Sequence, residues 1–370
     1  MKQKITGTPP PNISRIVLQG YKSIKGCDLT LSNLNVLIGP NGAGKSNFIS
    51  FFSLLIAMVE RKLQVFTAKN GGPDELLYFG RDKTRRIFVD ITTADGGYAF
   101  MLEPTKDNKL LVTQESVTFY ANSRKRVDFP SGLHEPAIGL NIDGTVEYHH
   151  VSLTLESWRA YHFNDTGDDS NIKRLQPIND NAFLRPDAGN LAAFLFRLQK
   201  NFPQNFQMIE KTVALAAPFF AGFHLRPDPD NKDIIQLEWR EHGSERPFKA
   251  HHLSDGTLRL ICLATVLLQP DGFLPATVII DEPELGLHPY AIGVTAGMLK
   301  SASTRTQIIA STQSVELLNH FSLEDIIVAD RTDNGTHLHR VDGSQLTDWL
   351  DEYGLGELWE KNLIGGRPSR

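Results

Sequence analysis

The stretch LNVLIGPNGAGKSNF, residues 34–48, decides the fold of this chain. Five residues typical of a buried strand run directly into a glycine-rich loop, and an apolar helical segment starts near Lys45. Every fixed position of the pattern G-x-x-x-x-G-K-[ST] is filled between Gly39 and Ser46. Strand, glycine loop and helix is the order in which phosphate-binding loops are built. The stretch therefore predicts a nucleotide phosphate site in an α/β fold.

The residue types of this loop suit the phosphates of a nucleotide. Its backbone N–H groups can converge on the β-phosphate, and the helix N-terminus adds a favourable dipole. Lys45 is expected to hold the β- and γ-phosphates, and the Ser46 hydroxyl to ligate Mg²⁺. The alternative is a glycine turn with a solvated lysine, which the flanking strand and helix disfavour. The predicted ATP-binding residues are Gly39, Pro40, Asn41, Gly42, Ala43, Gly44, Lys45, Ser46 and Asn47.

A second apolar strand, residues 277–280, places two acidic residues at its C-terminal tip. Open α/β sheets bind their ligands at that edge. Asp281 suits the environment of the metal ion, and Glu282 suits a general base that polarises the attacking water. An acidic pair after a strand can instead be a solvated helix cap. The phosphate loop elsewhere in the chain favours the catalytic interpretation.

A third motif, residues 252–257, lies about one turn before an apolar helix that runs to Leu268. Ser254 or Asp255 can cap this helix, with Gly256 easing the turn. A serine, a glycine and a helix N-terminus also form an anion site. Because the chain then holds two phosphate-binding features far apart in sequence, it predicts a dimer in which each subunit closes the other's ATP.

Composition excludes several protein classes. The 370 residues are 41% hydrophobic and 22% charged, values of a chain that buries a large core rather than a disordered or collagen-like one. The net charge of −5 excludes a uniformly basic coat for nucleic acid. The longest apolar run, residues 48–59, is too short to span a membrane, and the N-terminus has no apolar signal core. With only Cys27 and Cys262, a reducing, cytoplasmic location without membrane attachment is expected.

Hydrophobic periodicity and turn residues divide the chain. Strands are expected at 13–18, 34–38, 87–91, 98–102, 112–120, 277–280, 307–310 and 326–328, and helices at 190–198, 206–217 and 254–268. The expected organisation is a flexible leader (1–12), an ATPase core in two parts (13–66 and 250–370), an inserted β-rich lobe (67–189) and a helical signature-lobe segment (190–249).

These motifs together carry a resemblance to a family. Residues 18–24, 39–46, 253–257, 278–289 and 311–314 resemble the ABC-type ATPases, in the SMC, Rad50, RecF and OLD branch rather than the transporters. The ending, residues 353–368, is similar to that of stand-alone bacterial "AAA family" ATPases, often encoded in anti-phage loci. The resemblance covers roughly 13–52 and 251–370, and it is loose in between. It implies an α/β P-loop head of the ABC type, RecF/SMC-like, with an inserted β lobe and a small helical lobe.

The resemblance also implies roles for single residues. ATP would lie between the phosphate loop of one subunit and Ser254, Asp255 and Gly256 of its twin in a homodimer. Glu282, Lys45 and Gln313 would be the catalytic residues. Ser46 and Asp281 would bind the metal ion, and the D-loop would contain Leu287 and His288.

Three positions depart from the family pattern. Gln313 stands where many relatives have a switch histidine; an amide can hydrogen-bond a γ-phosphate but cannot carry the proton of an imidazole. The hydrolysis rate is therefore in question, whereas nucleotide binding is not. His288 replaces the D-loop aspartate of the transporters. The Q-loop has no clear match; residues 161–165 are one candidate, and a strand end turning at Asn164 and Asp165 is the alternative.

The expected function is an ATPase that dimerises on ATP and regulates a partner effector or DNA, in anti-phage defence or DNA maintenance. The first alternative, motivated by Gln313, is an ATP-dependent assembly switch that does not hydrolyse. A transporter nucleotide-binding subunit is the other alternative, against which the large β insert argues. The stretch after Gln313 is too short for the nuclease domain that OLD relatives carry, so a separate nuclease, Toprim-like or toxic effector is expected.

Possible DNA contacts stay open. Two basic clusters, residues 81–86 and 124–126, can contact DNA phosphates or can be solvated hairpin edges. The scattered histidines, including the adjacent pairs 149–150 and 251–252, show no metal-ligand pattern and are expected to be surface or loop residues.

Overall fold

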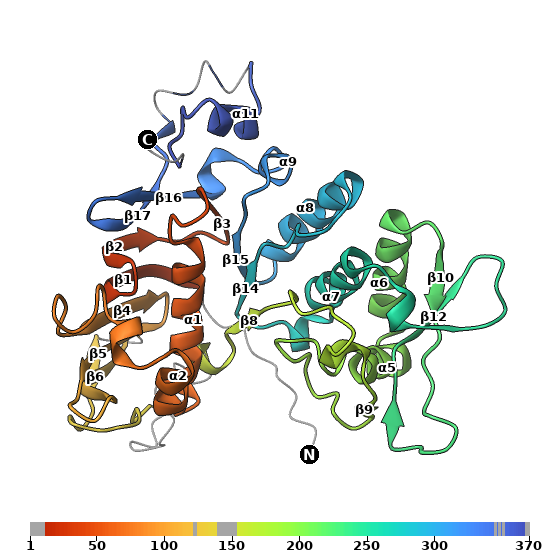
Figure 1. The fold of residues 1–370 in the computed structure, drawn as a ribbon, viewed down its shortest axis with the longest axis horizontal. Helices are drawn as coiled ribbons and strands as arrows, with labels where there is room; N and C mark the ends of the chain where they lie inside the picture. The colour runs from red at the N-terminus through yellow and green to blue at the C-terminus, as the bar shows by residue number, and fades with distance from the viewer. Residues whose placement is uncertain are drawn as a thin grey trace.

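The structure is a computed structural model that describes residues 12–120, 124–138, 154–343, 346, 349 and 352–366. The expected leader, residues 1–12, lies outside the described residues except for Asn12. Figure 1 shows the described chain as stacked layers, with helix α1 (Lys45–Val59) between two sheets and further helices on the far side. The α/β P-loop architecture expected from the sequence is confirmed.

The central layer is a six-stranded sheet in the order β17-β16-β3-β15-β14-β8. Five of its strands, β8, β14, β15, β3 and β16, run parallel to one another. At the edge, β17 forms an antiparallel hairpin with β16. The strands are β3 (Leu34–Ile38), β8 (Arg159–Tyr161), β14 (Thr277–Asp281), β15 (Gln307–Ser311), β16 (Ile326–Thr332) and β17 (Gly335–Arg340). The four strands predicted here from continuous apolar runs (34–38, 277–280, 307–310 and 326–328) are all present.

Both faces of this sheet are buried. Along β3, Val36 and Ile38 belong to the hydrophobic cluster of the helical side, whereas Leu37 belongs to the cluster around α1. The same alternation occurs in β14, where Ile279 faces α1 and its two apolar neighbours face the other helices. Helix α1 and helix α7 (Asp255–Leu268) therefore pack on opposite faces of one sheet.

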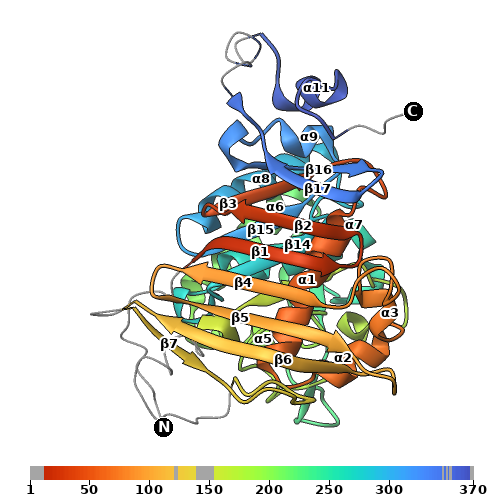
Figure 2. The same ribbon diagram turned by 90° about the vertical axis from the view of Figure 1, so that its left-hand side faces the viewer.

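A second six-stranded sheet, antiparallel, covers the other side of α1 in the order β2-β1-β4-β5-β6-β7, as Figure 2 shows. Its strands are β1 (Ile13–Tyr21), β2 (Ile24–Thr30), β4 (Ile87–Thr93), β5 (Gly96–Pro104), β6 (Leu110–Phe119) and β7 (Lys125–Asp128). The predicted β4-β5 hairpin is present. β1 and β2, expected in the ATPase core, pair with strands of the inserted lobe, whereas β8, expected in that lobe, pairs with β14 of the core. The two sheets therefore do not follow the boundaries expected at residues 66–67 and 189–190.

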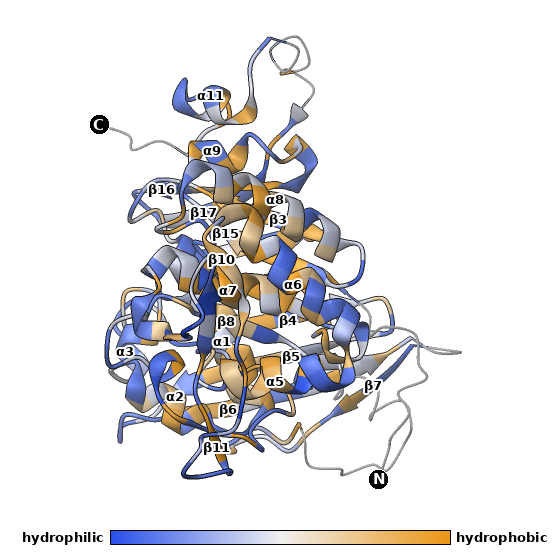
Figure 3. Ribbon diagram, turned by 90° about the vertical axis from the view of Figure 1, so that its right-hand side faces the viewer, coloured by the Kyte–Doolittle hydropathy of each residue, from blue (hydrophilic) through white to orange (hydrophobic). Residues whose placement is uncertain are grey.

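The helical layer contains α5 (Leu191–Asn201), α6 (Pro203–Ala216), α7 and α8 (Pro289–Ser303). In Figure 3, polar and apolar residues alternate along α6, while α7 is mainly apolar because it is buried against the sheet. A small sheet, β10-β12-β13, follows α5 and α6 in the lobe expected to be helical, and β11 of that lobe pairs with β9, which precedes α5 in the chain. The other elements are α2 (Leu63–Lys69), α3 (Pro73–Leu76), α9 (Val315–Leu318), α11 (Leu355–Glu360), β9 (Gln176–Pro177), β10 (Phe220–Phe223), β11 (Ile234–Ile235), β12 (Glu238–Glu241), β13 (Phe248–Lys249) and 3-10 turns at Asn171–Lys173, Ala250–His252, Asp271–Phe273 and Leu323–Asp325.

None of the helices in the described part of the chain is long and apolar enough to cross a membrane.

Candidate nucleotide-binding site

The phosphate loop joins β3 to α1 at the carboxyl edge of the parallel sheet. The Lys45 ammonium is buried and donates to the carbonyl oxygens of Gly39 (2.6 Å) and Pro40 (3.1 Å), which close the loop around it. Gly44, at the N-cap of α1, makes no side-chain capping bond. The first N–H groups of α1 are therefore not satisfied by a cap, as an anion site requires.

Gly44 cannot be replaced without moving the loop. Its φ is 104°, and a Cβ at this position would lie 2.0 Å from Thr336 Oγ1. Thr336 donates to the Ala43 carbonyl (2.7 Å), and Asn47 donates to Ser23 Oγ (2.6 Å), which is 2.7 Å from Thr336 Oγ1. The terminal hairpin and the β1-β2 turn thus hold the loop. No local pattern marks Thr336 as a partner of the loop, because it lies 293 residues from Ala43.

The predicted acidic pair lies beside the loop. Asp281, the last residue of β14, is in register with Ser311 of β15 and accepts a hydrogen bond from its hydroxyl. Glu282 has a positive φ of 49° and accepts a hydrogen bond from the side-chain amide of Gln313. The alternative was that the acidic pair caps the next helix. That helix, α8, is capped by His288, so this alternative is wrong.

The nearby carboxylates interact electrostatically with Lys45 of the phosphate loop. Burial lowers the pKa of Lys45, and the negative charges of Glu282, Asp281 and Glu284 oppose that shift. Residues of three motifs therefore lie near one another here: Lys45 of the phosphate loop, Asp281 and Glu282 of the acidic strand end, and Gln313, which donates to Glu282.

Glu284 also belongs to this site, although its position in the sequence predicted no separate role for it. Its Oε1 accepts from the Thr312 hydroxyl and from the Gln313 N–H (3.2 Å). Its Oε2 is buried without a hydrogen-bond partner among the described residues. Burial raises the pKa of this carboxyl.

The raised pKa of Glu284 leads to a pH-dependent effect of Glu284→Gln on stability. Folding favours the neutral form of this carboxyl. The folded state therefore loses stability as pH rises from the ordinary pKa near 4.5 to the raised pKa, and it regains that stability as pH falls back to 4.5. Glutamine removes the charge and keeps an acceptor for Thr312. We expect urea denaturation to show a stability gain at pH 8 that shrinks toward pH 4, by up to about 1.4 kcal/mol per pH unit between the two pKa values. Glu245→Gln, at an exposed position, is the control; equal gains at both pH values would contradict the assignment.

The Q-loop candidate also reaches this edge. Strand β8 pairs with β14 so that Tyr161 is in register with Ile280, which puts His162 next to Asp281. Burial lowers the pKa of His162, and the nearby Asp281 opposes the shift. The alternative was a strand end turning at Asn164 and Asp165: β8 does end at Tyr161, but no turn is present at these two residues.

The third motif begins α7. Ser254 caps the helix by accepting from the Thr257 N–H (3.2 Å), and Ser254 and Asp255 are both exposed. Gly256 packs against the D-loop so closely that a Cβ would lie 2.2 Å from the Gly286 carbonyl oxygen. The motif therefore presents its polar groups outward while its glycine fits the D-loop.

Arg259, one turn further along α7, connects these loops. Its guanidinium donates to the carbonyl oxygens of Leu285 (2.9 Å), Phe163 (3.2 Å) and Asn164 (3.1 Å). Of the two predicted D-loop residues, Leu287 is half-buried against the helical core, and His288 is exposed and accepts from the Tyr290 N–H (3.3 Å). Nothing in the local sequence marks Arg259, because its partners lie on two distant loops.

The donor set at the sheet edge fits Mg²⁺. The Ser46 hydroxyl is exposed at the first turn of α1, and the Asp281 carboxylate and the unpartnered Glu284 Oε2 add hard oxygen atoms. Oxygen donors of this kind are the ligands Mg²⁺ prefers.

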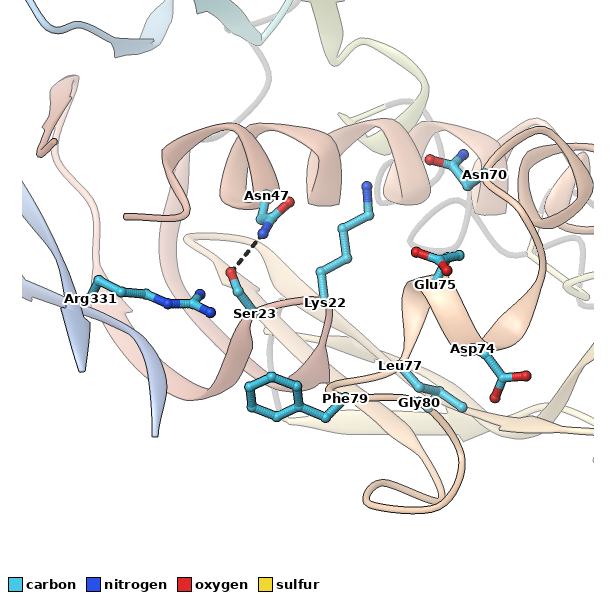
Figure 4. A pocket seen from close by; sticks show the side chains of 10 residues that line it. All are labelled: Lys22, Ser23, Asn47, Asn70, Asp74, Glu75, Leu77, Phe79, Gly80 and Arg331. Atoms are coloured by element: carbon cyan, nitrogen blue, oxygen red, sulfur yellow. Dashed lines mark hydrogen bonds between the residues drawn. The ribbon is translucent and has the colours of Figure 1, made fainter. Parts of the chain in front are cut away.

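A cavity of about 670 Å³ adjoins the first turn of α1. Figure 4 shows Asn47 hydrogen-bonded to Ser23 in the lining of this cavity, with the Lys22 side chain directed toward α1 and Arg331 approaching from the hairpin. Burial lowers the pKa of Lys22, and Glu75 opposes the shift. The lining therefore places two cationic groups, Lys22 and Arg331, together with the carboxylates of Asp74 and Glu75 beside the first turn of α1.

Part of the predicted basic surface is neutralised. Arg81 pairs with Asp74 and Arg126 with Asp128, each at 2.8 Å. Arg124 lies 6.0 Å from the centre of the Tyr120 ring. The histidine pair 149–150 lies outside the described residues.

Comparison with known proteins identifies the family of this chain. A family model described as "AAA domain, putative AbiEii toxin, Type IV TA system" matches residues 34–319. The OLD nuclease of Thermus scotoductus is 25% identical over 93% of this chain, which spans 67% of that protein. The RecF DNA replication and repair protein of Vibrio vulnificus is 46% identical over 44 residues, 12% of each chain.

Solved structures share the fold. The Smc head domain of Pyrococcus furiosus, solved with an extended coiled coil and the C-terminal domain of ScpA, has a TM-score of 0.61 at 14% identity and covers 92% of this chain and 99% of that one. An SmcHead bound to the C-winged helix domain of ScpA has a TM-score of 0.56 at 14% identity, covering 91% of this chain and all of that one. The chain therefore belongs to the AAA-domain family described above, and it is an ABC-type ATPase domain of the branch that contains the OLD nucleases, RecF and the SMC heads.

Proposed function

We propose that this protein binds ATP with Mg²⁺ and hydrolyses it to ADP and phosphate. The observation that supports this most is the meeting of Lys45, Asp281, Glu282 and Gln313 at one edge of the parallel sheet. Each residue has the chemistry of one step: Lys45 neutralises phosphate charge, Glu282 polarises water, and Gln313 donates a hydrogen bond near the reacting group. Ser46 and Asp281 would hold Mg²⁺, which supplies charge neutralisation at the phosphates.

The cavity beside α1 is the proposed place of the nucleoside. Its lining includes Asn47, in the first turn of α1 just after the phosphate loop. Lys22 and Arg331 line it and supply positive charge that suits the α-phosphate side of the nucleotide.

We further propose that ATP closes a homodimer. Ser254 and Asp255 are exposed at the start of α7, whereas α1 packs on the opposite face of the sheet. A second subunit would bring its own helix start to this chain's phosphate loop, where N–H groups and a serine hydroxyl suit the γ-phosphate.

The output is proposed to be control of a separate effector, a nuclease, Toprim-like protein or toxin, or of DNA, in the cytoplasm. The names of two matched relatives, a nuclease and a DNA repair protein, support the link to nucleic acid, and a role in anti-phage defence or DNA maintenance follows the family resemblance. Cys27 and Cys262 are both free thiols, as in a reducing compartment.

A second candidate is an assembly switch that binds ATP without turnover. The Gln313 amide donates to Glu282 and so uses one oxygen of the base. In this candidate, dimer closure itself is the signal, and the amide cannot relay a proton as histidine does.

Steady-state phosphate release, measured with and without double-stranded DNA beside ATP-dependent dimerisation, separates the two candidates. We expect turnover, slow alone and faster with DNA or effector, that is lost in Lys45→Ala. ATP-driven dimerisation with no phosphate release under either condition would reject the hydrolytic proposal and support the switch.

A further inference from the structure

Three ligating side chains lie together on one face of the terminal hairpin. Strands β16 and β17 pair so that Asp330 is directly opposite His337. His339 is two residues further along β17, so its side chain is on the same face as that of His337. One ligating atom from each of the three lies within 4.8 Å of the others. The local sequence does not mark these histidines as ligands, because the partner carboxylate comes from the other strand.

The carboxylate and one imidazole are already oriented toward each other. Asp330 Oδ1 accepts from the Gly366 N–H (2.7 Å), while Oδ2 lies 3.8 Å from His339 Nδ1. His339 Nδ1 is itself buried and has no hydrogen-bond partner among the described residues. The unpartnered nitrogen of His339 therefore lies next to a carboxylate whose other oxygen is fixed by a hydrogen bond. A metal ion bound between them would satisfy both groups.

We propose that Asp330, His337 and His339 bind a divalent transition metal ion, with Zn²⁺ as the representative. Two imidazoles and one carboxylate are ligands typical of Zn²⁺ and its neighbours, whereas Mg²⁺ prefers oxygen atoms alone. Metal–ligand bonds of about 2.0–2.1 Å place tetrahedral ligand atoms about 3.4 Å apart, so the side chains need only small rotations from their present positions. Three protein ligands leave a fourth position for water or another group.

The site lies beside the phosphate loop but is separate from it. The residue before Asp330, Ala329, has its carbonyl oxygen against Gly39, and the residue before His337, Thr336, donates to Ala43. Gly366, which Asp330 holds, also approaches Gly39. A bound ion would therefore fix the hairpin and the segment around Gly366 next to the loop. The metal site does not depend on the proposed ATPase activity.

Titration of the untagged full chain with ZnCl₂, without nucleotide and followed by calorimetry, tests the site. We expect one ion per chain, bound without competition from millimolar MgCl₂. His337→Ala, at an exposed position, should weaken binding by at least about 100-fold, since loss of a direct ligand exceeds the 10–100-fold typical of outer partners. Asp330→Asn should weaken it too while keeping an acceptor for the Gly366 N–H. His242→Ala, an exposed histidine in the turn after β12, is the matched control and should bind as the parent does.

Hydrogen–deuterium exchange locates the ion independently. Zn²⁺ should slow exchange in residues 330–339 of the parent and not in His337→Ala. Undiminished Zn²⁺ affinity in both His337→Ala and Asp330→Asn, or protection confined to other parts of the chain, would overturn the proposal.

Discussion

Replacing Glu282 by glutamine should lower the rate of ATP hydrolysis by about 10²–10⁴-fold, the usual contribution of a positioned general base. The amide cannot accept the proton of the attacking water, yet its oxygen can still accept the hydrogen bond from Gln313. Nucleotide binding should persist, because Lys45 and the loop are unchanged. ATP-bound dimers should therefore accumulate, and light scattering after gel filtration would detect them.

Glu245→Gln is the control for this substitution, because it makes the same chemical change at an exposed position outside the site. It should leave both turnover and oligomeric state as in the parent. Normal turnover in Glu282→Gln would remove the assigned base and direct attention to Glu284, whose Oε2 is the next carboxylate oxygen at this edge.

Mixing two inactive variants should restore activity if ATP is shared between subunits. Lys45→Ala removes the phosphate ligand. Ser254→Asp keeps a good N-cap for α7 but places a carboxylate where a partner's γ-phosphate would lie. Each variant alone should lose ATP-driven dimerisation and turnover. In a mixed dimer, one site carries both changes and the other carries neither.

Because neither variant pairs with itself, a one-to-one mixture should recover up to about one half of the parent's sites, since each mixed dimer has one intact site of two. Phosphate release measured across mixing ratios should be highest near equal amounts. Thermal unfolding of Ser254→Asp, unchanged from the parent, would show that its helix is intact. Full activity of Ser254→Asp by itself, or a mixture as inactive as its parts, would contradict the shared site.

Local sequence patterns accounted for much of the fold because they act over a few residues. The apolar run 34–38, the glycine loop and the helix at Lys45 are adjacent in the chain, so their order alone predicts the phosphate site. The strand ending at Asp281 is similarly marked by continuous apolar residues. The domain limits were harder to predict from the sequence. The β1-β2 hairpin joins the antiparallel sheet because β1 pairs with β4, and no local signal shows that a strand at residues 13–21 pairs with one at residues 87–93.

The amino-acid sequence by itself determined the strand–loop–helix unit, the acidic strand end and the capped start of α7, since spacing and residue type carry that information along the chain. Only the tertiary structure decided which distant groups meet: Thr336 against the phosphate loop, Arg259 across two loops, Glu284 with a buried unpartnered oxygen, and Asp330 opposite His337. The physical reason is that sheet register and face-to-face packing bring together residues far apart in the chain, and their chemistry appears only when they are in contact.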